Sequence, residues 1–130
     1  MQELAEDEET RIVLGGDLNI DSIHHVEAWE AAKGILHPLE SVMDKGAYRV
    51  PEGGRPYPVT HHKWDVCLDH IFVHSMVVAA DSLQLHKWPA DFATPLTADD
   101  TEPVLVSDHY GVSLTFVPCS TGGHDRVAPQ

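Results

Sequence analysis

The chain has 130 residues, which suits a single domain, and 42% of them are hydrophobic, an ordinary share for a globular protein. Its formal net charge of −13, from 21 acidic and 8 basic residues, repels a nucleic-acid backbone and argues against a non-specific nuclease. The sequence has no run of about 18 apolar residues to span a membrane, and its acidic start lacks the basic region of a secretory signal. We therefore expect a cytoplasmic location by default. The two cysteines, Cys67 and Cys119, are expected to be reduced thiols, although a disulfide between them stays open.

The first predicted strand covers residues 12–14 and ends at a Gly-Gly pair that is followed by Asp17 and Asn19. Because residues two apart in a strand point the same way, we expect these two side chains to be directed at one spot. A carboxylate beside an amide suits a hard metal ion and a phosphate oxygen. An ordinary turn, in which the aspartate side chain bonds to nearby backbone, explains the same residues, so both interpretations stay open.

A helix is predicted over residues 23–33, with Asp21 and Ser22 as its N-cap and Gly34 as its stop signal. Its expected buried stripe consists of Ile23, Val26, Trp29 and Ala31. Residues 34–62 contain several prolines and glycines and are predicted to form mostly loop.

Further strands are predicted over residues 66–73, 76–85 and 104–116, with an acidic loop over residues 88–104. We expect an acidic N-terminal segment at residues 1–10, a domain over 11–118 and a disordered tail at 119–130.

Charged residues begin two of these strands. Asp69 interrupts an apolar run, and burying a carboxylate is costly unless it has a partner. His109, in the pair Asp108-His109 at the start of the last strand, is the predicted partner. Taken singly, Asp69 can pair with any lysine or arginine, and the Asp108-His109 pair fits a solvated turn.

Three segments occur in an order that resembles the endonuclease/exonuclease/phosphatase superfamily: Gly-Asp-Leu-Asn at 16–19, Leu-Asp-His-Ile-Phe-Val at 68–73, and Ser-Asp-His-Tyr-Gly-Val at 107–112. The resemblance extends over most of the chain, with a slight lean toward the sphingomyelinase-like members. It implies the α/β class, and within it the C-terminal half of a four-layer α/β sandwich of the DNase I-like type. In that fold two packed mixed β-sheets are flanked by helices, and the active site lies at one end.

The resemblance also implies a divalent-metal-dependent phosphoesterase that hydrolyses a phosphodiester or a phosphomonoester with Mg²⁺, or Mn²⁺. The acidic balance of the chain favours a phospholipid or small phosphodiester over DNA as the substrate. Asp17 would orient the attacking water and contact the metal, and Asn19 would bind a phosphate oxygen. Asp108 would approach the metal directly or through water. His109 would serve as the acid/base or as a cation on the phosphate, while Asp69 would orient its imidazole and raise its pKa.

The resembling enzymes carry an asparagine, a glutamate that is their principal metal ligand, and a second histidine well before the Gly-Asp-Leu-Asn segment. That segment begins here at residue 16. We therefore expect the chain to be a fragment equivalent to the C-terminal half, to need the N-terminal half, and to show weak or no activity alone.

Two alternatives stay open: a non-catalytic binding or regulatory module, and a histidine-rich metal-binding protein. The candidate histidines for such a metal site are His61 with His62 and His70 with His74. The segment Thr60–Trp64 also resembles the family's threonine-plus-aromatic approach to the acid-bearing strand. For this segment we favour a packing role for Trp64 and solvated histidines over ligation.

Overall fold

The structure, a computed structural model, describes residues 10–87 and 107–118 and has the mixed α/β class that the sequence predicts. Its elements in chain order are β1 (Ile12–Asp17), α2 (Val26–Leu36), β2 (Glu40–Ser41), the 3₁₀ helix η1 (Val42–Lys45), β3 (Asp69–His74), β4 (Val77–Val78), β5 (Gln84–His86), β6 (Gly111–Ser113) and β7 (Phe116–Val117). The predicted acidic segment, acidic loop and C-terminal tail, together with Cys119, lie almost entirely or entirely outside the described residues.

The central sheet has the strand order β1-β3-β2, and both of its strand pairs are antiparallel. Its long pair runs in register from Ile12 opposite His74 to Asp17 opposite Asp69. β3 has a partner strand on each side, and its apolar residues Phe72 and Val73 are both buried because apolar residues cover both faces of the sheet. This register brings the polar ends of β1 and β3 to one rim of the sheet.

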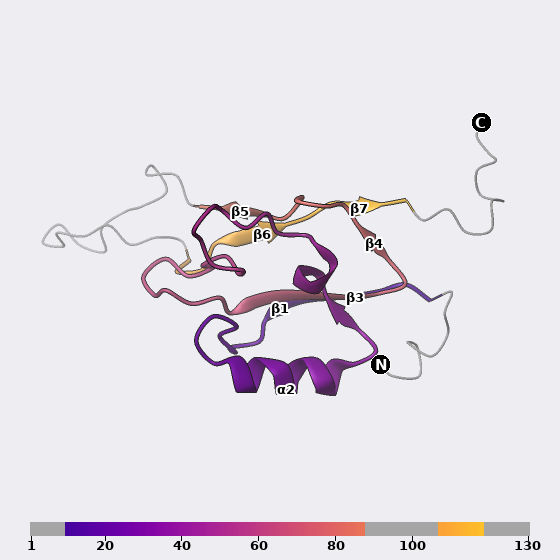
Figure 1. Ribbon diagram of the computed structural model, residues 1–130, viewed down its shortest axis with the longest axis horizontal. Coiled ribbons are helices and arrows are strands. Elements are labelled where there is room, and N and C mark those ends of the chain that lie inside the picture. The colour runs from indigo at the N-terminus through magenta and orange to yellow at the C-terminus, as the bar shows by residue number, and fades with distance from the viewer. Residues whose placement is uncertain (1–9, 88–106, 119–130) are drawn as a thin grey trace, which may run out of the picture.

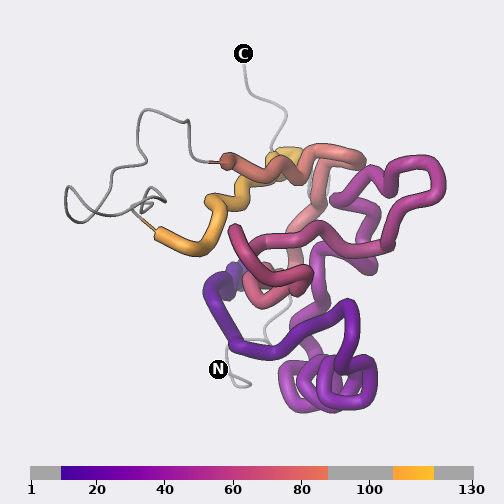
Figure 2. Tube along the Cα trace, turned by 90° about the vertical axis from the view of Figure 1, so that its left-hand side faces the viewer, coloured from indigo at the N-terminus to yellow at the C-terminus, as the bar shows by residue number. Residues whose placement is uncertain are grey.

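Two smaller antiparallel sheets, β4-β7 and β5-β6, lie on one side of the central sheet, and α2 lies on the other (Figure 1). The perpendicular view in Figure 2 shows the same separation of α2 from the strands at residues 111–117. Every strand pair among the described residues is antiparallel. The α/β class is therefore confirmed, whereas the finer arrangement of two mixed sheets in four layers is not seen in this part of the chain.

Two apolar clusters fill the spaces on either side of the central sheet. The cluster under α2 consists of Trp29, Ala32, Leu39 and Phe72. The cluster on the opposite side consists of Val42, Ala47, Val73, Val78 and Leu83. Full burial of a large apolar side chain contributes about 1.5–3 kcal/mol, so these clusters hold the sheet that carries the polar rim.

The helix begins and ends about three residues later than predicted. Asp21 does not cap it, because its carboxylate accepts hydrogen bonds from the backbone N–H groups of Ile23, His24 and Cys67. The carboxylate therefore closes a preceding turn and ties it to the segment before β3. Gly34 lies inside the helix and does not end it.

The predicted buried stripe of the helix is correct at one of its four positions. Trp29 is buried together with Ala32, whereas Val26 is 57% exposed and Ala31 is exposed. Trp29 and Ala32 are three residues apart and share one face of the helix, whereas Ala31 points about 200° away from Trp29 and Ile23 lies before the helix. Among the described residues no helix is long and apolar enough to cross a membrane.

The predicted strands are shorter than expected, apart from the first. β1 continues through the glycine pair to Asp17, and Gly16 has a φ of 153°, a value that glycine adopts more readily than other residues. The strand predicted over 76–85 is split into β4 and β5 by a turn in which Asp81 has a left-handed φ of 58°. The last predicted strand is likewise split into β6 and β7 within the described residues, and its residues 104–106 lie outside them.

Candidate functional site

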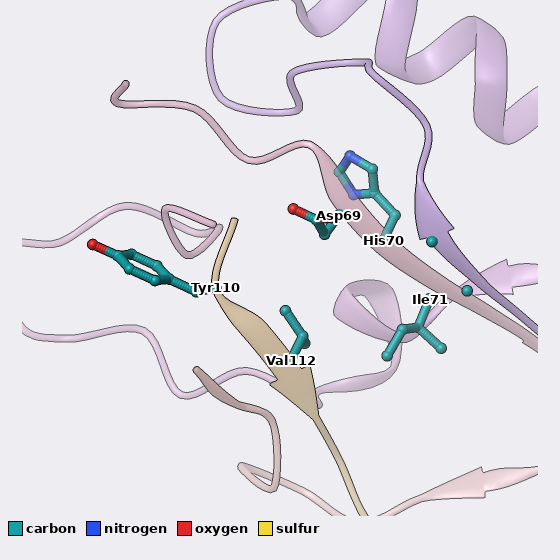
Figure 3. A pocket seen from close by; sticks show the side chains of 7 residues that line it. Asp69, His70, Ile71, Tyr110 and Val112 are labelled. Carbon is teal, nitrogen blue, oxygen red and sulfur yellow. The ribbon is translucent and has the colours of Figure 1, made fainter. Parts of the chain in front are cut away.

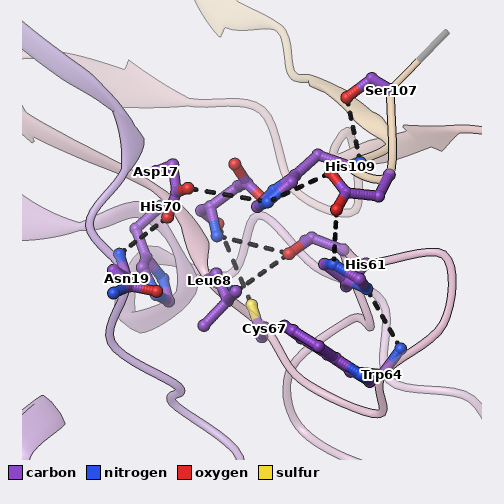
Figure 4. Close-up of polar contacts among 12 residues, drawn as sticks. Asp17, Asn19, His61, Trp64, Cys67, Leu68, His70, Ser107 and His109 are labelled. Atoms are coloured by element: carbon purple, nitrogen blue, oxygen red, sulfur yellow. Dashed lines mark hydrogen bonds and ion pairs between the residues drawn. The ribbon is translucent and has the colours of Figure 1, made fainter.

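Two carboxylates and one imidazole meet at the polar rim of the central sheet. Asp17 and Asp69 are direct cross-strand partners, so their side chains point to the same face. The His109 ring lies between them, with its Nδ1 2.8 Å from Asp69 Oδ2 and its Nε2 3.6 Å from Asp17 Oδ2. Figure 4 shows the contact between the Asp17 carboxylate and the His109 ring. The prediction that Asp69 has His109 as its partner is confirmed.

Backbone pairing fixes the segment that carries His109. The His62 N–H donates to the Asp108 carbonyl at 2.6 Å, and the Tyr110 N–H donates to the Thr60 carbonyl at 2.9 Å. These bonds form an isolated antiparallel bridge between residue 61 and His109. The Asp108-His109 pair is therefore held against the loop that precedes β3 and does not form an isolated solvated turn.

Thr60 fixes the start of β3 from inside this loop. Its side chain is fully buried, and its Oγ1 accepts hydrogen bonds from the N–H groups of Leu68 at 3.0 Å and Asp69 at 3.3 Å. The Asp69 carboxylate consequently leaves the strand at a defined point, 19% exposed and directed at His109.

Three carboxylates stabilise the protonated form of His109. The hydrogen bond to Asp69 is the largest influence and raises the pKa of His109; burial opposes it, and the charges of Asp69, Asp17 and Asp108 add to it. With Asp69 as acceptor, Nδ1 carries a proton, and in the imidazolium form Nε2–H is directed at the more exposed carboxylates. The site therefore favours a cationic hydrogen-bond donor at His109.

The same groups have the donor atoms that a metal ion needs. His109, Asp17 and Asp69 offer ligand atoms that all lie within 4.8 Å of one another, and so do His109, Asp108 and His61. Asp17 and Asp108 belong to different groups, which share only His109. Their carboxylates are 47% and 65% exposed, so an ion held by either keeps room for water ligands. Mg²⁺ binds proteins through one or two carboxylates and several waters, and these residues fit that pattern.

Asn19 is placed differently from the prediction. It lies beyond the end of β1 with a left-handed φ of 54°, and its backbone N–H donates to Asp17 Oδ1 at 2.8 Å. The turn interpretation therefore describes this pair, and the strand alternation that would align the two side chains does not extend to Asn19. Its carboxamide makes no hydrogen bond within the part of the chain that the structure describes.

His61 lies in the site, although the sequence suggests it only as half of a His61-His62 metal pair and favours solvated histidines here. His61 is only 3% exposed, whereas its neighbour His62 is exposed and meets Tyr110 edge-on. The His61 Nε2 lies 3.3 Å from Asp108 Oδ2. Its burial depends on the bridge to residue 109, a long-range contact that no local pattern reveals.

The other predicted histidine pair is not a metal site in this structure. His70 is buried against the Trp29 ring, with centroids 4.2 Å apart, and its Nε2 donates to the Ile20 carbonyl at 2.8 Å. Burial lowers the pKa of His70 and favours its neutral form. His74 pairs with Ile12 at the opposite end of the long strand pair. His70 therefore packs in the core, and His74 lies four residues further along the strand, about 13 Å away and too far to share a metal ion with it.

A cavity of about 240 Å³ adjoins Asp69 between β3 and β6 (Figure 3). Its lining consists of Gly15, Gly16, Asp69, His70, Ile71, Tyr110 and Val112. Most of this lining is apolar, with the Asp69 carboxylate at one side. The cavity therefore offers space for a small apolar group next to the polar rim.

Comparison with protein-family models, curated proteins and solved structures found no match to this chain.

Proposed function

We propose that this chain carries the acid/base part and a metal-facing part of a divalent-metal-dependent phosphoric ester hydrolase. One observation supports this most strongly: the His109 imidazole bonds to the semi-buried Asp69 on one side and faces the exposed Asp17 and Asp108 carboxylates on the other. A protonated His109 can stabilise negative charge that develops on a phosphate group during hydrolysis, and the exposed carboxylates beside it can contact a metal ion or water. The resemblance to the endonuclease/exonuclease/phosphatase superfamily and its four-layer sandwich belongs to the same proposal.

Each residue has a step that its geometry permits. Asp17 accepts a proton from the attacking water while the new P–O bond forms, and the P–O bond to the leaving group breaks. The His109 Nε2–H then protonates the departing oxygen, and Asp69 keeps the ring in the orientation and charge state that this step needs. Positioned proton transfer of this kind contributes about 10²–10⁴-fold to a rate.

Mg²⁺ is the proposed cofactor, with Mn²⁺ as a substitute, and Asp17 and Asp108 would hold it. When bound, it neutralises charge on the phosphate oxygens. Asn19 is proposed to bind a phosphate oxygen through its carboxamide. A further glutamate and asparagine from another polypeptide segment would complete the site, as the resemblance implies.

The proposed substrate is a phospholipid or a small phosphodiester. The net charge of −13 disfavours a DNA backbone. The largely apolar cavity beside Asp69 accommodates a small apolar part of such a substrate.

Metal binding gives the first test because it does not require a complete active site. Mn²⁺ binding to the full chain is measured by calorimetry for the wild type, Asp17→Ala and Asp108→Ala. We expect each variant to weaken binding at least tenfold. Asp44→Ala is the matched control, because Asp44 is 48% exposed and pairs with Lys33 away from the site. Unchanged Mn²⁺ affinity in both site variants would contradict the proposed ligands.

Catalysis gives the second test. Hydrolysis of p-nitrophenyl phosphate, bis(p-nitrophenyl) phosphate and sphingomyelin is followed with Mg²⁺ or Mn²⁺, with EDTA as the blank. His109→Ala should lower the rate about 10²-fold or more. His25→Ala, at an exposed histidine beside α2, should leave the rate unchanged. A metal-dependent rate that survives His109→Ala would refute the assigned acid.

A second candidate is transition-metal binding without hydrolysis, which the imidazole of His109 within 4.8 Å of two carboxylates favours. Zinc is ligated by histidine and carboxylate groups, whereas Mg²⁺ prefers oxygen. Tight Zn²⁺ binding that Mg²⁺ does not displace, with no esterase activity in any metal, would support this candidate.

A further inference from the structure

The His61 ring has contacts on both of its nitrogen atoms. Nδ1 accepts hydrogen bonds from the backbone N–H groups of Lys63 and Trp64, each at 3.1 Å. Nε2 lies 3.3 Å from Asp108 Oδ2. The Trp64 ring stacks on the imidazole, with centroids 4.5 Å apart and planes 8° apart, and the imidazole is 3% exposed. The ring is therefore enclosed and held from several directions.

The two backbone contacts determine where the His61 proton lies. A backbone N–H can only donate, so Nδ1 must present its lone pair to Lys63 and Trp64. A neutral imidazole carries one proton, which is consequently on Nε2, the atom that faces Asp108. At 3.3 Å the contact is slightly longer than an ordinary N–H···O hydrogen bond, and the carboxylate that it reaches is 65% exposed.

We infer that His61 is a positioning residue whose Nε2–H holds the Asp108 carboxylate beside His109, and that His61 is not a metal ligand. This deepens the proposed function and rests on it to the extent that Asp108 belongs to the site. Asp108 is 65% exposed, and apart from His61 the described partner of its carboxylate is His109, at 4.0 Å. The buried donor limits the directions in which this exposed carboxylate can point.

The tautomer separates His61 from the spatial group that could hold an ion. His61, Asp108 and His109 lie close enough together to ligate one metal. Ligation through His61 Nε2 would require a lone pair on that atom and would move the proton to Nδ1. Both backbone hydrogen bonds would then be lost, because the N–H groups of Lys63 and Trp64 would face a protonated Nδ1, which is itself a donor. His109 lacks this restriction, since its Nδ1 faces the Asp69 carboxylate.

Long-range ¹H–¹⁵N spectra of the histidine rings test the tautomer directly in the full chain. The His61 signals are assigned by their disappearance in His61→Asn. We expect Nε2 to appear as the protonated nitrogen and Nδ1 as the unprotonated one, both without metal and with saturating Mg²⁺. A proton on Nδ1 in either state overturns the inference, whatever the activity of the chain.

A double-mutant cycle in Mn²⁺ affinity tests the action through Asp108. In His61→Asn the amide oxygen replaces Nδ1 as acceptor for the two backbone N–H groups, but the Nε2 donor is absent. We expect His61→Asn to weaken Mn²⁺ binding about 10–100-fold in the wild-type background and to have no further effect in Asp108→Asn. An equal loss in both backgrounds would identify His61 as a direct ligand and overturn the inference.

His61→Gln is the complementary variant, because its amide N–H₂ replaces the Nε2 donor while the acceptor is lost. We expect it to retain more Mn²⁺ affinity than His61→Asn, provided that circular dichroism shows both variants folded. If the wild type binds no Mn²⁺, the proposed function fails, and the ring spectra still decide whether His61 has the assigned tautomer. The two failures are thus distinguishable.

Discussion

Asp17 and Asp69 face each other directly across β1 and β3, and the His109 ring contacts both carboxylates. Like charges at directly opposed positions destabilise a strand pair. A protonated His109 offsets this repulsion, because its Nδ1–H bonds to one carboxylate and its Nε2–H faces the other. The sheet register and the charge state of the imidazole are therefore coupled.

Replacing Asp69 with asparagine should lower the pKa of His109 toward its ordinary value. The hydrogen bond to Asp69 is the largest cause of the raised pKa, and asparagine removes its charge. The ring Cε1–H resonance of His109, followed against pH in the metal-free chain, measures the shift. Asp44→Asn, remote from this ring, should leave the titration unchanged. An unshifted His109 pKa in Asp69→Asn would contradict the coupling.

The stability effect of the same pair has a defined sign. Because the folded pKa of His109 is raised, its stabilisation is complete below the unfolded pKa of about 6.5 and is lost as pH rises through the folded value. Asp69→Asn should therefore cost up to about 1 kcal/mol at pH 5.5 and less at pH 9. Urea unfolding at the two pH values measures the difference, and a larger cost at pH 9 would refute this account.

The sequence was sufficient for the parts of the site that follow from local chemistry. Asp69 stands in an apolar strand, so it had to have a partner, and His109 is that partner. The turn at Asp17 and Asn19 was one of two interpretations that the sequence left open, and the hydrogen bond from the Asn19 N–H to the Asp17 carboxylate decides for it. The α/β class was implied by the family resemblance, and the described residues have the mixed class with one α-helix among strands.

Long-range contacts decided what the sequence could not show. The Asp21 carboxylate bonds to the N–H of Cys67, 46 residues away, and thereby shifts the start of α2. His61 is buried because its segment pairs with residue 109. Neither contact leaves a trace in local hydrophobic periodicity, which is the main sequence signal for secondary structure.

Replacing Thr60 with valine should destabilise the chain although the two side chains have nearly the same shape. The change leaves the N–H groups of Leu68 and Asp69 without their shared acceptor at a buried position. An unsatisfied buried donor costs about 1–3 kcal/mol. Urea unfolding measures the loss, and Thr60→Ser, which keeps Oγ1, is the matched control. Equal stability of the valine and serine variants would contradict the role of the hydroxyl.

Cys67 should react slowly with thiol reagents in the folded chain. It is a free, fully buried thiol, and burial raises its pKa to about 11. At pH 8 about one thiol in a thousand is then ionised, and the thiolate is the reactive form. Labelling of a Cys119→Ser variant with Ellman's reagent should be at least about 10²-fold slower in buffer than in denaturant. Rapid labelling in buffer would show that Cys67 is accessible.

Asp21 should stabilise the chain at neutral pH and lose this effect in acid. Its carboxylate is 3% exposed; burial alone would raise its pKa, but the hydrogen bonds from Cys67, Ile23 and His24 outweigh that effect and lower it. A depressed folded pKa gives stabilisation that is present above the unfolded pKa of about 3.9 and is lost as pH falls through the folded value.

Replacement of Asp21 by asparagine removes this titration but keeps one acceptor oxygen for Ile23 and Cys67. In the wild type the His24 N–H donates to Asp21 Oδ2. In the variant the asparagine NH₂ group takes the place of Oδ2, so two donors face each other. We expect a cost of about 1–3 kcal/mol at pH 7 that shrinks below about pH 4. Urea unfolding at pH 7, 5 and 3.5 measures it. A cost that stayed constant over this range would mean that the carboxylate acts through its shape and not through its charge.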